Sequence, residues 1–508
     1  MKIIKVHNKK ISGGYRYNLE GKPRDELIEL GLSSKVVIPL KQGFGREVKP
    51  IVKAGDKVKA GQIIGRDDQG ISSPVHASVN GVVESLTMLE YLQGGVIAVV
   101  IKTDGTTEWQ RLTGYNPDWR RLSQEQIERL LYYSGVTSLD ERGIPTRYKT
   151  STISNRQVKD LIIREIEDSP YHQSLSAILA DEKLDRFIES IKILQKIMPQ
   201  ANIHLAINRE RHQLVQELAL KTKELEWLNL YPLSPRYPQG NDQLLGRIIC
   251  GDHTGKNVKS KKTIVLSAAT LLHIHDAITE GKPLIDRTVA LCGSGWKENL
   301  HLKVRIGTPL NFITESYLQQ SGSYRLIPNN LLTSEAITDY SFPVDRSLTN
   351  LSTVPETTNR KFLPFLRPGN KRSSYSERYL SALSPLTEQS CDTDVCGEIR
   401  PCIFCCYCEE VCPVGNIPHL IDKHAKRNLI TKDLIGYGAF ECVECNLCTF
   451  VCPSKIPVAE NIRLGRQKLI EQGYKRLSAD GSEEEMIGDY SLEEERGIAN
   501  EPAKQNIG

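Results

Sequence analysis

Long apolar runs, a strong excess of one charge and evenly spread cysteines are all missing from this sequence of 508 residues. No segment approaches the roughly 18 continuous apolar residues of a membrane-spanning helix, and the start, Met1–Lys5, lacks the apolar core of a signal peptide. Lysine and arginine number 66 against 62 for aspartate and glutamate, so the charge balance does not indicate a nucleic-acid partner. We therefore expect any association with a membrane to be peripheral.

What is present is the composition of a folded protein with several domains. Hydrophobic residues make up 39% of the chain and charged residues 25%, values typical of globular proteins. At roughly 150 residues per domain, this length predicts about three domains.

Cysteine is nearly absent from the first 390 residues and concentrated after them. Cys250 and Cys292 precede this region, whereas the rest of the 13 cysteines lie between Cys391 and Cys452. Such clustering argues against a disulfide framework and favours a metal site in a reducing compartment. We expect Cys250 and Cys292 to be buried core residues.

The segment from residue 35 to residue 86 has the pattern of short strands between frequent turns. Val36–Leu40 is an apolar strand, Val52–Gln62 alternates around two glycine turns, and Asn80-Gly81 is a hairpin signal. The pattern is similar to the barrel-sandwich fold of biotinyl and lipoyl domains, which display a lysine for modification at the hairpin tip. Because Asn80-Gly81 occupies that kind of turn here, we expect a docking or packing module rather than a modified carrier.

Longer periodic segments follow between about residues 118 and 233, and they predict an α/β domain. The signals are a capping-box-like helix start at Leu122–Ile127, helical periodicity at Glu182–Gln195 and Arg209–Leu220, and apolar strand-like runs at Leu161–Ile163 and Ile203–Ile207.

The predicted fold class is a multidomain α+β protein. We place an N-terminal β module at residues 1–110, the α/β domain at 111–285, a small β-rich module at 286–335, a connecting segment at 336–390, the cysteine-rich helical domain at 391–475 and an acidic tail at 476–508.

The cysteine-rich region contains the same motif twice, each copy with the spacing C-x-x-C-x-x-C-x-x-x-C-P. In two-cluster ferredoxins the first three cysteines of a copy bind one [4Fe–4S] cluster and the fourth reaches across to the other. The spacing thus predicts two crossed quartets and a pseudo-twofold domain for one-electron transfer. The predicted ligands are Cys402, Cys405, Cys408 and Cys452 for one cluster, and Cys442, Cys445, Cys448 and Cys412 for the other.

Zinc is the alternative, because C-x-x-C pairs also occur in zinc ribbons and fingers. Zinc sites use four ligands in two pairs, whereas each run here offers three cysteines plus one, followed by proline. Cys391, Cys396 and Cys406 are left over; they either pack as free thiols or form a third metal site.

With these motifs considered, the chain resembles the C subunit of the Rnf ion-pumping electron-transport complex, and it is similar to the A subunit of the sodium-translocating NADH:quinone reductase. The Rnf-type order includes Asp118–Ser123, Tyr237–Gly240, Glu280–Leu284, Ile306–Leu310 and the double cysteine motif. Segments more like the quinone-reductase subunit are Phe365–Gly369, Gly397–Pro401 and Leu447–Pro453.

This resemblance implies a barrel-sandwich-like module, an FMN- and NADH-binding type of α/β domain, a β-grasp-like module of the SLBB type and a dicluster ferredoxin domain. It further implies an iron–sulfur electron-transfer subunit, peripheral on the cytoplasmic side of the bacterial inner membrane. The implied partners are membrane and peripheral subunits of an electron-transport complex, with ferredoxin or a dehydrogenase as electron donor.

One stretch departs from the family. The family's FMN loop has the form G-x-G-G-A-G-F-P-T, and here Gly135, Gly143, Pro145 and Thr146 remain while Ser138, Asp140 and Glu141 stand where glycines would be. Side chains would fill the space, and two carboxylates would face anionic phosphates. We therefore expect the domain to keep its fold without FMN or NADH, although Arg142 and Arg147 offer an alternative way to bind phosphate.

Two other interpretations stay open. One is a soluble, ferredoxin-linked reductase similar to the cobalamin reductase of bacterial microcompartments. The other is a non-catalytic assembly scaffold whose clusters are structural.

Overall fold

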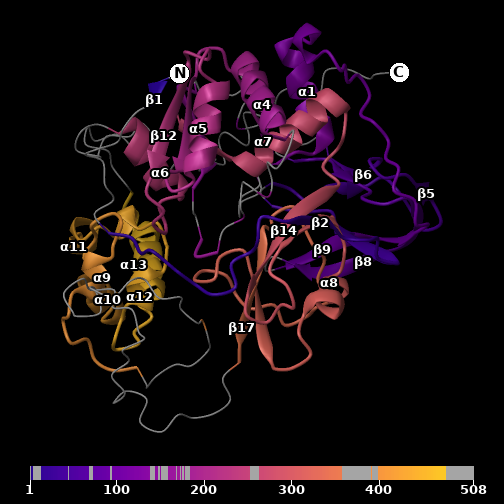
Figure 1. Cartoon of the computed structure of the whole chain (residues 1–508). Helices are drawn as coiled ribbons and strands as arrows, with labels where there is room; N and C mark the ends of the chain where they lie inside the picture. Colours follow the sequence, from indigo (N-terminus) through magenta and orange to yellow (C-terminus); the bar gives the residue numbers. More distant parts are fainter. Residues whose placement is uncertain are drawn as a thin grey trace.

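The computed structural model of the chain shows four β-sheets and a separate group of helices (Figure 1). It describes residues 2–3, 13–43, 45–67, 72–91, 94–137, 144–146, 149, 158–166, 169–171, 173, 177, 183–251, 263–356, 391 and 399–475.

Two small sheets form the N-terminal module. The alternation of Val36, Ile38 and Leu40 buries these side chains between the sheets. Asn80 is also buried, and its side chain accepts a hydrogen bond from the backbone N–H of Ala60 at 2.8 Å, so this turn does not project into solvent as a carrier tip would. The first sheet has the order β3 (Lys35–Pro39), β9 (Gly94–Thr103), β8 (Gly81–Tyr91), β5 (Lys57–Val58), and the second the order β4 (Lys49–Pro50), β6 (Ile63–Arg66), β7 (Val75–His76).

A parallel sheet with helices on both faces forms the middle domain, as the periodicity predicts. The helices are α1 (Gln124–Ser134), α4 (Lys183–Ile197), α5 (His212–Lys221), α6 (Asp242–Cys250) and α7 (Ala268–His275). The strand order is β1 (Lys2–Ile3), β12 (Leu228–Leu233), β11 (Asn202–Asn208), β10 (Asp160–Glu165), β13 (Thr263–Ser267). The predicted capping box is confirmed, since Ser123 and Gln126 bond each other's backbone N–H groups at the start of α1.

The strand order reverses between β10 and β13, because β11 and β12 lie on one side of β10 and β13 lies on the other. In open parallel sheets, ligands bind at the carboxyl ends of the strands beside such a reversal. The carboxyl edge of β10 and β13 is therefore the expected ligand-binding crevice of the middle domain.

The third module is a mixed sheet that draws its strands from two distant parts of the sequence. Its order is β16 (Tyr324–Pro328), β17 (Asn350–Pro355), β14 (Asp286–Gly293), β15 (His301–Arg305), β2 (Leu27–Glu29), with α8 (Leu310–Tyr317) beside it. β17 lies within residues 336–390, which we expected to be a connecting segment. Its serine and threonine content indicated a loop, but Leu351, Ser352 and Thr353 are all buried and the strand pairs with both β14 and β16.

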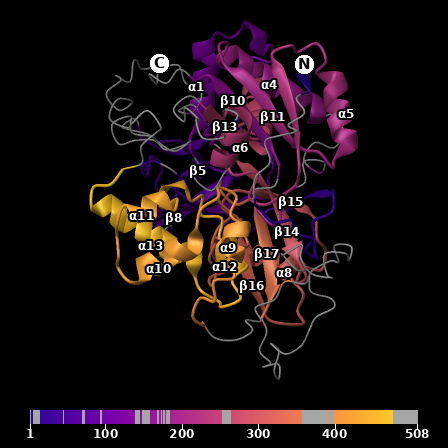
Figure 2. The same cartoon turned by 90° about the vertical axis from the view of Figure 1, so that its left-hand side faces the viewer.

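The cysteine-rich domain lies beside the middle domain and the third module as a separate group of helices in orange to yellow (Figures 1 and 2). It consists of α9 (Tyr407–Glu410), α10 (Pro418–Lys426), α11 (Asp433–Gly436), the single turn Ala439–Glu441, α12 (Leu447–Phe450) and α13 (Val458–Glu471). Within the described part of the chain, no helix is both long and apolar enough to cross a membrane.

Candidate redox centres and the middle-domain crevice

One cavity in the cysteine-rich domain collects the first predicted quartet. Cys402, Cys405 and Cys408 come from the loop that leads into α9 and from its first turn, and Cys452 follows α12. The same cavity is lined by Cys406 and by His419 at the start of α10. Residues from both copies of the motif thus meet around one space.

A second cavity collects the other quartet. Cys442, Cys445 and Cys448 come from the second copy, and Cys412 reaches this cavity from the first. The described residues therefore bring together all eight predicted cysteines in the crossed arrangement.

The backbone repeats with the motif. Phe404 and Cys406 have φ angles of 54° and 59°, and their counterparts 40 residues later, Glu444 and Asn446, have 55° and 62°. These left-handed residues curl each loop so that successive cysteines face the same space. Backbone N–H groups also point at sulfur, as in the 3.3 Å contact from Asn416 to Cys412 Sγ.

Burial keeps most of these thiols neutral in the absence of a metal. It raises the pKa of Cys408, Cys442 and Cys445 to about 12, and that of Cys448 well above its usual value. The neighbouring cysteines raise it further, because each thiolate would face others in a space of low dielectric constant. Thiolates are stable here only when a cationic group balances their charge, so loading a metal must release protons.

The two cavities differ in exposure and surroundings. Cys402 is exposed, and Ile399, Ile403 and Phe404 near it expose large apolar side chains. The second cavity faces the body of the protein instead: the Tyr237 hydroxyl donates to the carbonyl oxygen of Cys445 at 2.7 Å. No local pattern in the sequence indicated this docking, because Tyr237 lies more than 200 positions from Cys445.

Other contacts fix the same interface. The Asn446 side chain donates to the Leu332 carbonyl, and Arg247 of α6 forms an ion pair with Glu441. The N-terminal segment also passes here, since Gly14 N–H donates to the carbonyl oxygen of Val411 at 2.9 Å. The second cavity is thus held against the middle domain, and the first lies further out.

The remaining cysteines occupy separate places. Cys292 is fully buried in β14, as expected, whereas Cys250 at the end of α6 is only partly buried. Cys391 packs against a small apolar cluster that contains Cys292, and Cys406 lies beside Glu409 and His419. Cys396 lies outside the described residues, so the suggested third metal site stays a prediction.

In the middle domain, Gly135 is explained by packing. It ends α1 with a φ of 69°, and a Cβ atom there would lie 2.7 Å from the carbonyl oxygen of Pro74 in the N-terminal module. Thr137 pairs with Pro145, and the Thr146 N–H donates to the Val136 carbonyl, so these two short segments lie side by side. Ser138, Asp140, Glu141, Arg142, Gly143 and Arg147 lie outside the described residues.

A buried cation contacts β13, one of the two strands at the reversal. The Lys149 ammonium is buried and donates to the carbonyl oxygen of Val265 in β13 at 3.1 Å. The Thr137 hydroxyl is also buried, without a hydrogen-bond partner among the described residues. A buried ammonium and an unused hydroxyl are donors that suit an anionic phosphate. Residue spacing had given no reason to single out Lys149.

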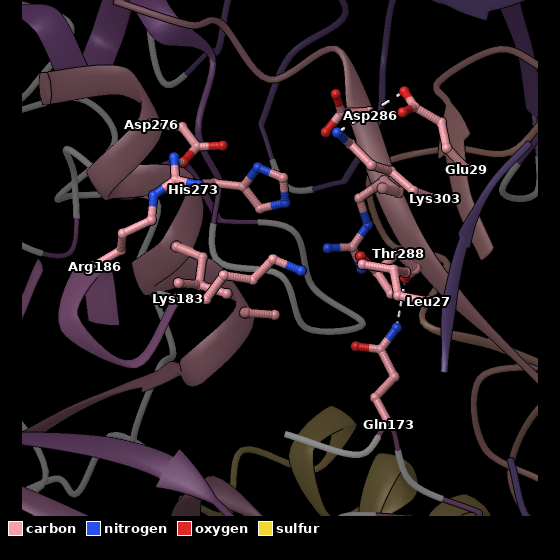
Figure 3. A pocket seen from close by; sticks show the side chains of 13 residues that line it. Leu27, Glu29, Gln173, Lys183, Arg186, His273, Asp276, Asp286, Thr288 and Lys303 are labelled. Carbon is pink, nitrogen blue, oxygen red and sulfur yellow. Dashed lines mark hydrogen bonds and ion pairs between the residues drawn. The ribbon is translucent and has the colours of Figure 1, made fainter. Parts of the chain in front are cut away.

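A larger cavity of about 290 Å³ separates α4 and α7 from β14 and β15 (Figure 3). Its charges are largely paired: Arg186 binds Asp276 at 2.8 Å, and Asp286 binds Lys282 at 2.6 Å. Burial lowers the pKa of His273, which faces the cavity, to about 4. The cavity thus lies between the middle domain and the third module, and most of the charged side chains around it form ion pairs.

Two domain families match the chain. Residues 16–106 match the RnfC barrel sandwich hybrid domain, and residues 132–276 match the Nuo51 FMN-binding domain. The second match corrects our expectation that FMN is absent. That expectation rested on a few residues such as Ser138, Asp140 and Glu141, whereas the match includes the four strands β10 to β13.

Full-length comparison finds relatives named as the C subunits of ion-translocating oxidoreductase complexes. The one from Buchnera aphidicola is 27% identical over 81% of this chain and 80% of its own length. The one from Pseudomonas aeruginosa is 25% identical over 89% of this chain, which spans 54% of that relative. The C subunit of the proton-translocating ferredoxin:NAD(+) oxidoreductase complex of Clostridium ljungdahlii is 27% identical over 54% of this chain and 61% of its own length.

An NAD⁺-reducing [NiFe]-hydrogenase structure aligns over 73% of this chain and 65% of its own chain, with 13% identity and a TM-score of 0.43. The domain matches and the relatives together show that this chain is similar to the C subunits of ion-translocating oxidoreductase complexes. Those relatives are subunits of ion-translocating oxidoreductase complexes, which is consistent with this chain being an oxidoreductase subunit.

Proposed function

We propose that this chain is the electron-transfer subunit of an Rnf-type, ion-translocating oxidoreductase, with two [4Fe–4S] clusters in its cysteine-rich domain. The observation that carries the proposal is the pair of cavities, each lined by one crossed quartet of cysteines. A [4Fe–4S] cluster, when bound, supplies reversible one-electron chemistry.

The spacing of the thiols supports clusters over single zinc ions. Four sulfurs around one zinc ion lie about 3.8 Å apart, given a Zn–S distance of about 2.3 Å and tetrahedral geometry. Among the described residues, the groups of three metal-binding donors within 4.8 Å of one another include no cysteine quartet. This wider spacing supports a cluster over a single zinc ion in each quartet.

The middle domain would hold FMN at the carboxyl edge of its sheet. Lys149 would balance phosphate charge, and Thr137 would donate a hydrogen bond to a phosphate oxygen. FMN, when bound, supplies the exchange between one- and two-electron chemistry. The matched Nuo51 domain supports this assignment.

The docking of the cysteine-rich domain supports an order for the two quartets, one toward the middle domain and the other toward solvent. The quartet around Cys445 faces the body that includes the middle domain, and the quartet around Cys402 faces solvent within an apolar surface. A partner subunit would approach Cys402, on the cytoplasmic side of the membrane. The SLBB-type module would fix the other domains relative to one another.

The test is a metal, sulfide and flavin assay of the full chain after anaerobic purification. We expect roughly eight iron atoms and eight sulfides per chain, because each of two cubane clusters contains four of each. Cys402→Ser and Cys442→Ser should each remove about half of the iron, and Cys292→Ser, a buried thiol outside both cavities, should remove none. Acid-released flavin should approach one FMN per chain in the wild type.

Electron paramagnetic resonance during reductive titration separates the alternatives. Two reversibly reducible signals, one lost in each ligand variant, support an electron path. Clusters that never become reduced would identify a scaffold, and zinc in place of iron would end the proposal.

A further inference from the structure

We propose a zinc-binding site formed by Asp160, His204 and Cys250, at the edge of the middle sheet opposite the crevice. A carboxylate oxygen, an imidazole nitrogen and a thiol sulfur from these residues all lie within 4.8 Å of one another. The three residues are distant in sequence, and neither cysteine quartet is involved. The inference is therefore independent of the proposed electron-transfer function.

The topology explains why these side chains meet. Asp160 is the first residue of β10, and its partner on the neighbouring strand β11 is Asn202. His204 lies two positions after Asn202 on the same strand. The side chains of Asp160 and His204 therefore lie on the same face of the sheet. Helix α6 covers that face and joins the end of β12 to the start of β13. It therefore runs antiparallel to the strands, and its last residue, Cys250, arrives at their amino ends.

The distances suit a small tetrahedral ion. Oxygen and nitrogen ligands at about 2.0 Å from zinc lie about 3.3 Å apart, and His204 Nε2 lies 3.1 Å from Asp160 Oδ1. Thiolate, imidazole and carboxylate are the three side-chain ligands that zinc uses, and three protein ligands leave a fourth position for water.

The electrostatics also favour a cation. The Asp160 carboxylate also accepts a hydrogen bond from the Asn202 side chain at 3.0 Å, which holds it in place. Cys250 is at the carboxyl end of α6, where the unpaired carbonyl groups of the helix give a partial negative charge.

His204 faces Asp160 with its Nε2 atom. The residue is 7% exposed, and zinc bound through Nε2 would leave the ring proton on Nδ1, which has no hydrogen-bond partner among the described residues. The ring is also held in place, because it packs edge-on against Tyr231 with centroids 5.5 Å apart.

Zinc at this position would fix the end of α6 to two central strands. The same helix carries Arg247, which pairs with Glu441 of the cysteine-rich domain. The site would thereby stabilise the helix that holds the second cysteine cavity against the middle domain.

The experiment uses the full chain with its metal clusters loaded, washed with chelator and then dialysed against zinc chloride. We expect roughly one zinc ion per chain, and X-ray absorption at the zinc edge should report one sulfur and about three nitrogen or oxygen ligands. Cys250→Ser and His204→Gln should each weaken zinc binding by at least about tenfold. The matched control, Cys292→Ser, should bind zinc as the wild type does.

Iron content and circular dichroism verify that each variant is folded and still holds its clusters. If His204→Gln does not fold, Cys250→Ser, at the partly exposed end of a helix, carries the test alone. Three results would overturn the proposal. They are a zinc ion with only sulfur ligands, zinc binding by Cys250→Ser that equals that of the wild type, and a wild-type chain that retains no zinc.

Discussion

The Tyr237 hydroxyl lies 2.7 Å from the backbone carbonyl oxygen of Cys445 and 3.2 Å from the side-chain nitrogen of Asn330. Tyr237 belongs to the middle domain, Asn330 to the third module and Cys445 to the cysteine-rich domain. One side chain therefore connects three structural units beside the second cysteine cavity, and its removal tests how far that cavity depends on its neighbours.

Tyr237→Phe should destabilise the cysteine-rich domain. The partly buried carbonyl of Cys445 loses this donor, and Asn330 loses this acceptor, at a cost of about 1–3 kcal/mol. Guanidinium titration, followed by loss of the cluster absorbance, measures the change. Tyr340→Phe is the matched control, because its hydroxyl contacts the Tyr324 carbonyl only at 3.5 Å. Equal midpoints for the two variants would contradict the role of Tyr237.

Oxidation should remove the two clusters at different rates. Cys402 is exposed, whereas Cys448 is buried and the second cavity faces the middle domain. Under mild ferricyanide treatment, we expect about half of the iron to leave quickly and the rest slowly. Cys442→Ser should show only the fast phase and Cys402→Ser only the slow one. A single shared rate in the wild type would argue against this difference.

His76 should make the fold less stable as the pH falls. Burial is the main cause that lowers the pKa of His76 from 6.5 to about 3, and the nearby Arg346 cation is the second. The ring therefore stays neutral in the folded chain. The unfolded chain binds this proton near pH 6.5, which removes about 1.4 kcal/mol of stability by pH 5.5. Urea midpoints from pH 7.5 to 5.5 measure the slope.

His76→Gln should reduce that slope. His212→Gln, on the exposed start of α5, should leave it unchanged. A slope that is identical in wild type and His76→Gln would show that other groups cause the acid sensitivity.

Gly135→Ala should weaken the packing of α1 on the N-terminal module. The added methyl group meets the Pro74 carbonyl at 2.7 Å and the Arg346 guanidinium at 2.9 Å. Gly105→Ala isolates the backbone cost, about 1–2 kcal/mol, because Gly105 also has a positive φ but no atom lies near its added Cβ. We expect a clearly larger loss of thermal stability for Gly135→Ala than for Gly105→Ala, and the reverse order would refute the packing role.

Some features followed directly from local sequence. The three-plus-one spacing of the cysteines predicted which of them would meet, and the repeat of left-handed residues 40 positions apart follows from the repeated motif. The start of α1 was predictable because a capping box needs only four consecutive residues. The loss of FMN was predicted from one loop, and this was wrong because a single loop does not represent a whole domain family.

The sequence by itself determined the spacing of the cysteines and the helical and strand periodicities, because these depend on neighbours a few positions apart. Only the tertiary structure decided that residues 27–29 and 350–355 join one sheet, that Tyr237 reaches Cys445, and that Asp160, His204 and Cys250 converge. These contacts join residues tens to hundreds of positions apart. Their geometry is set by the packing of whole sheets and helices, which local patterns do not encode.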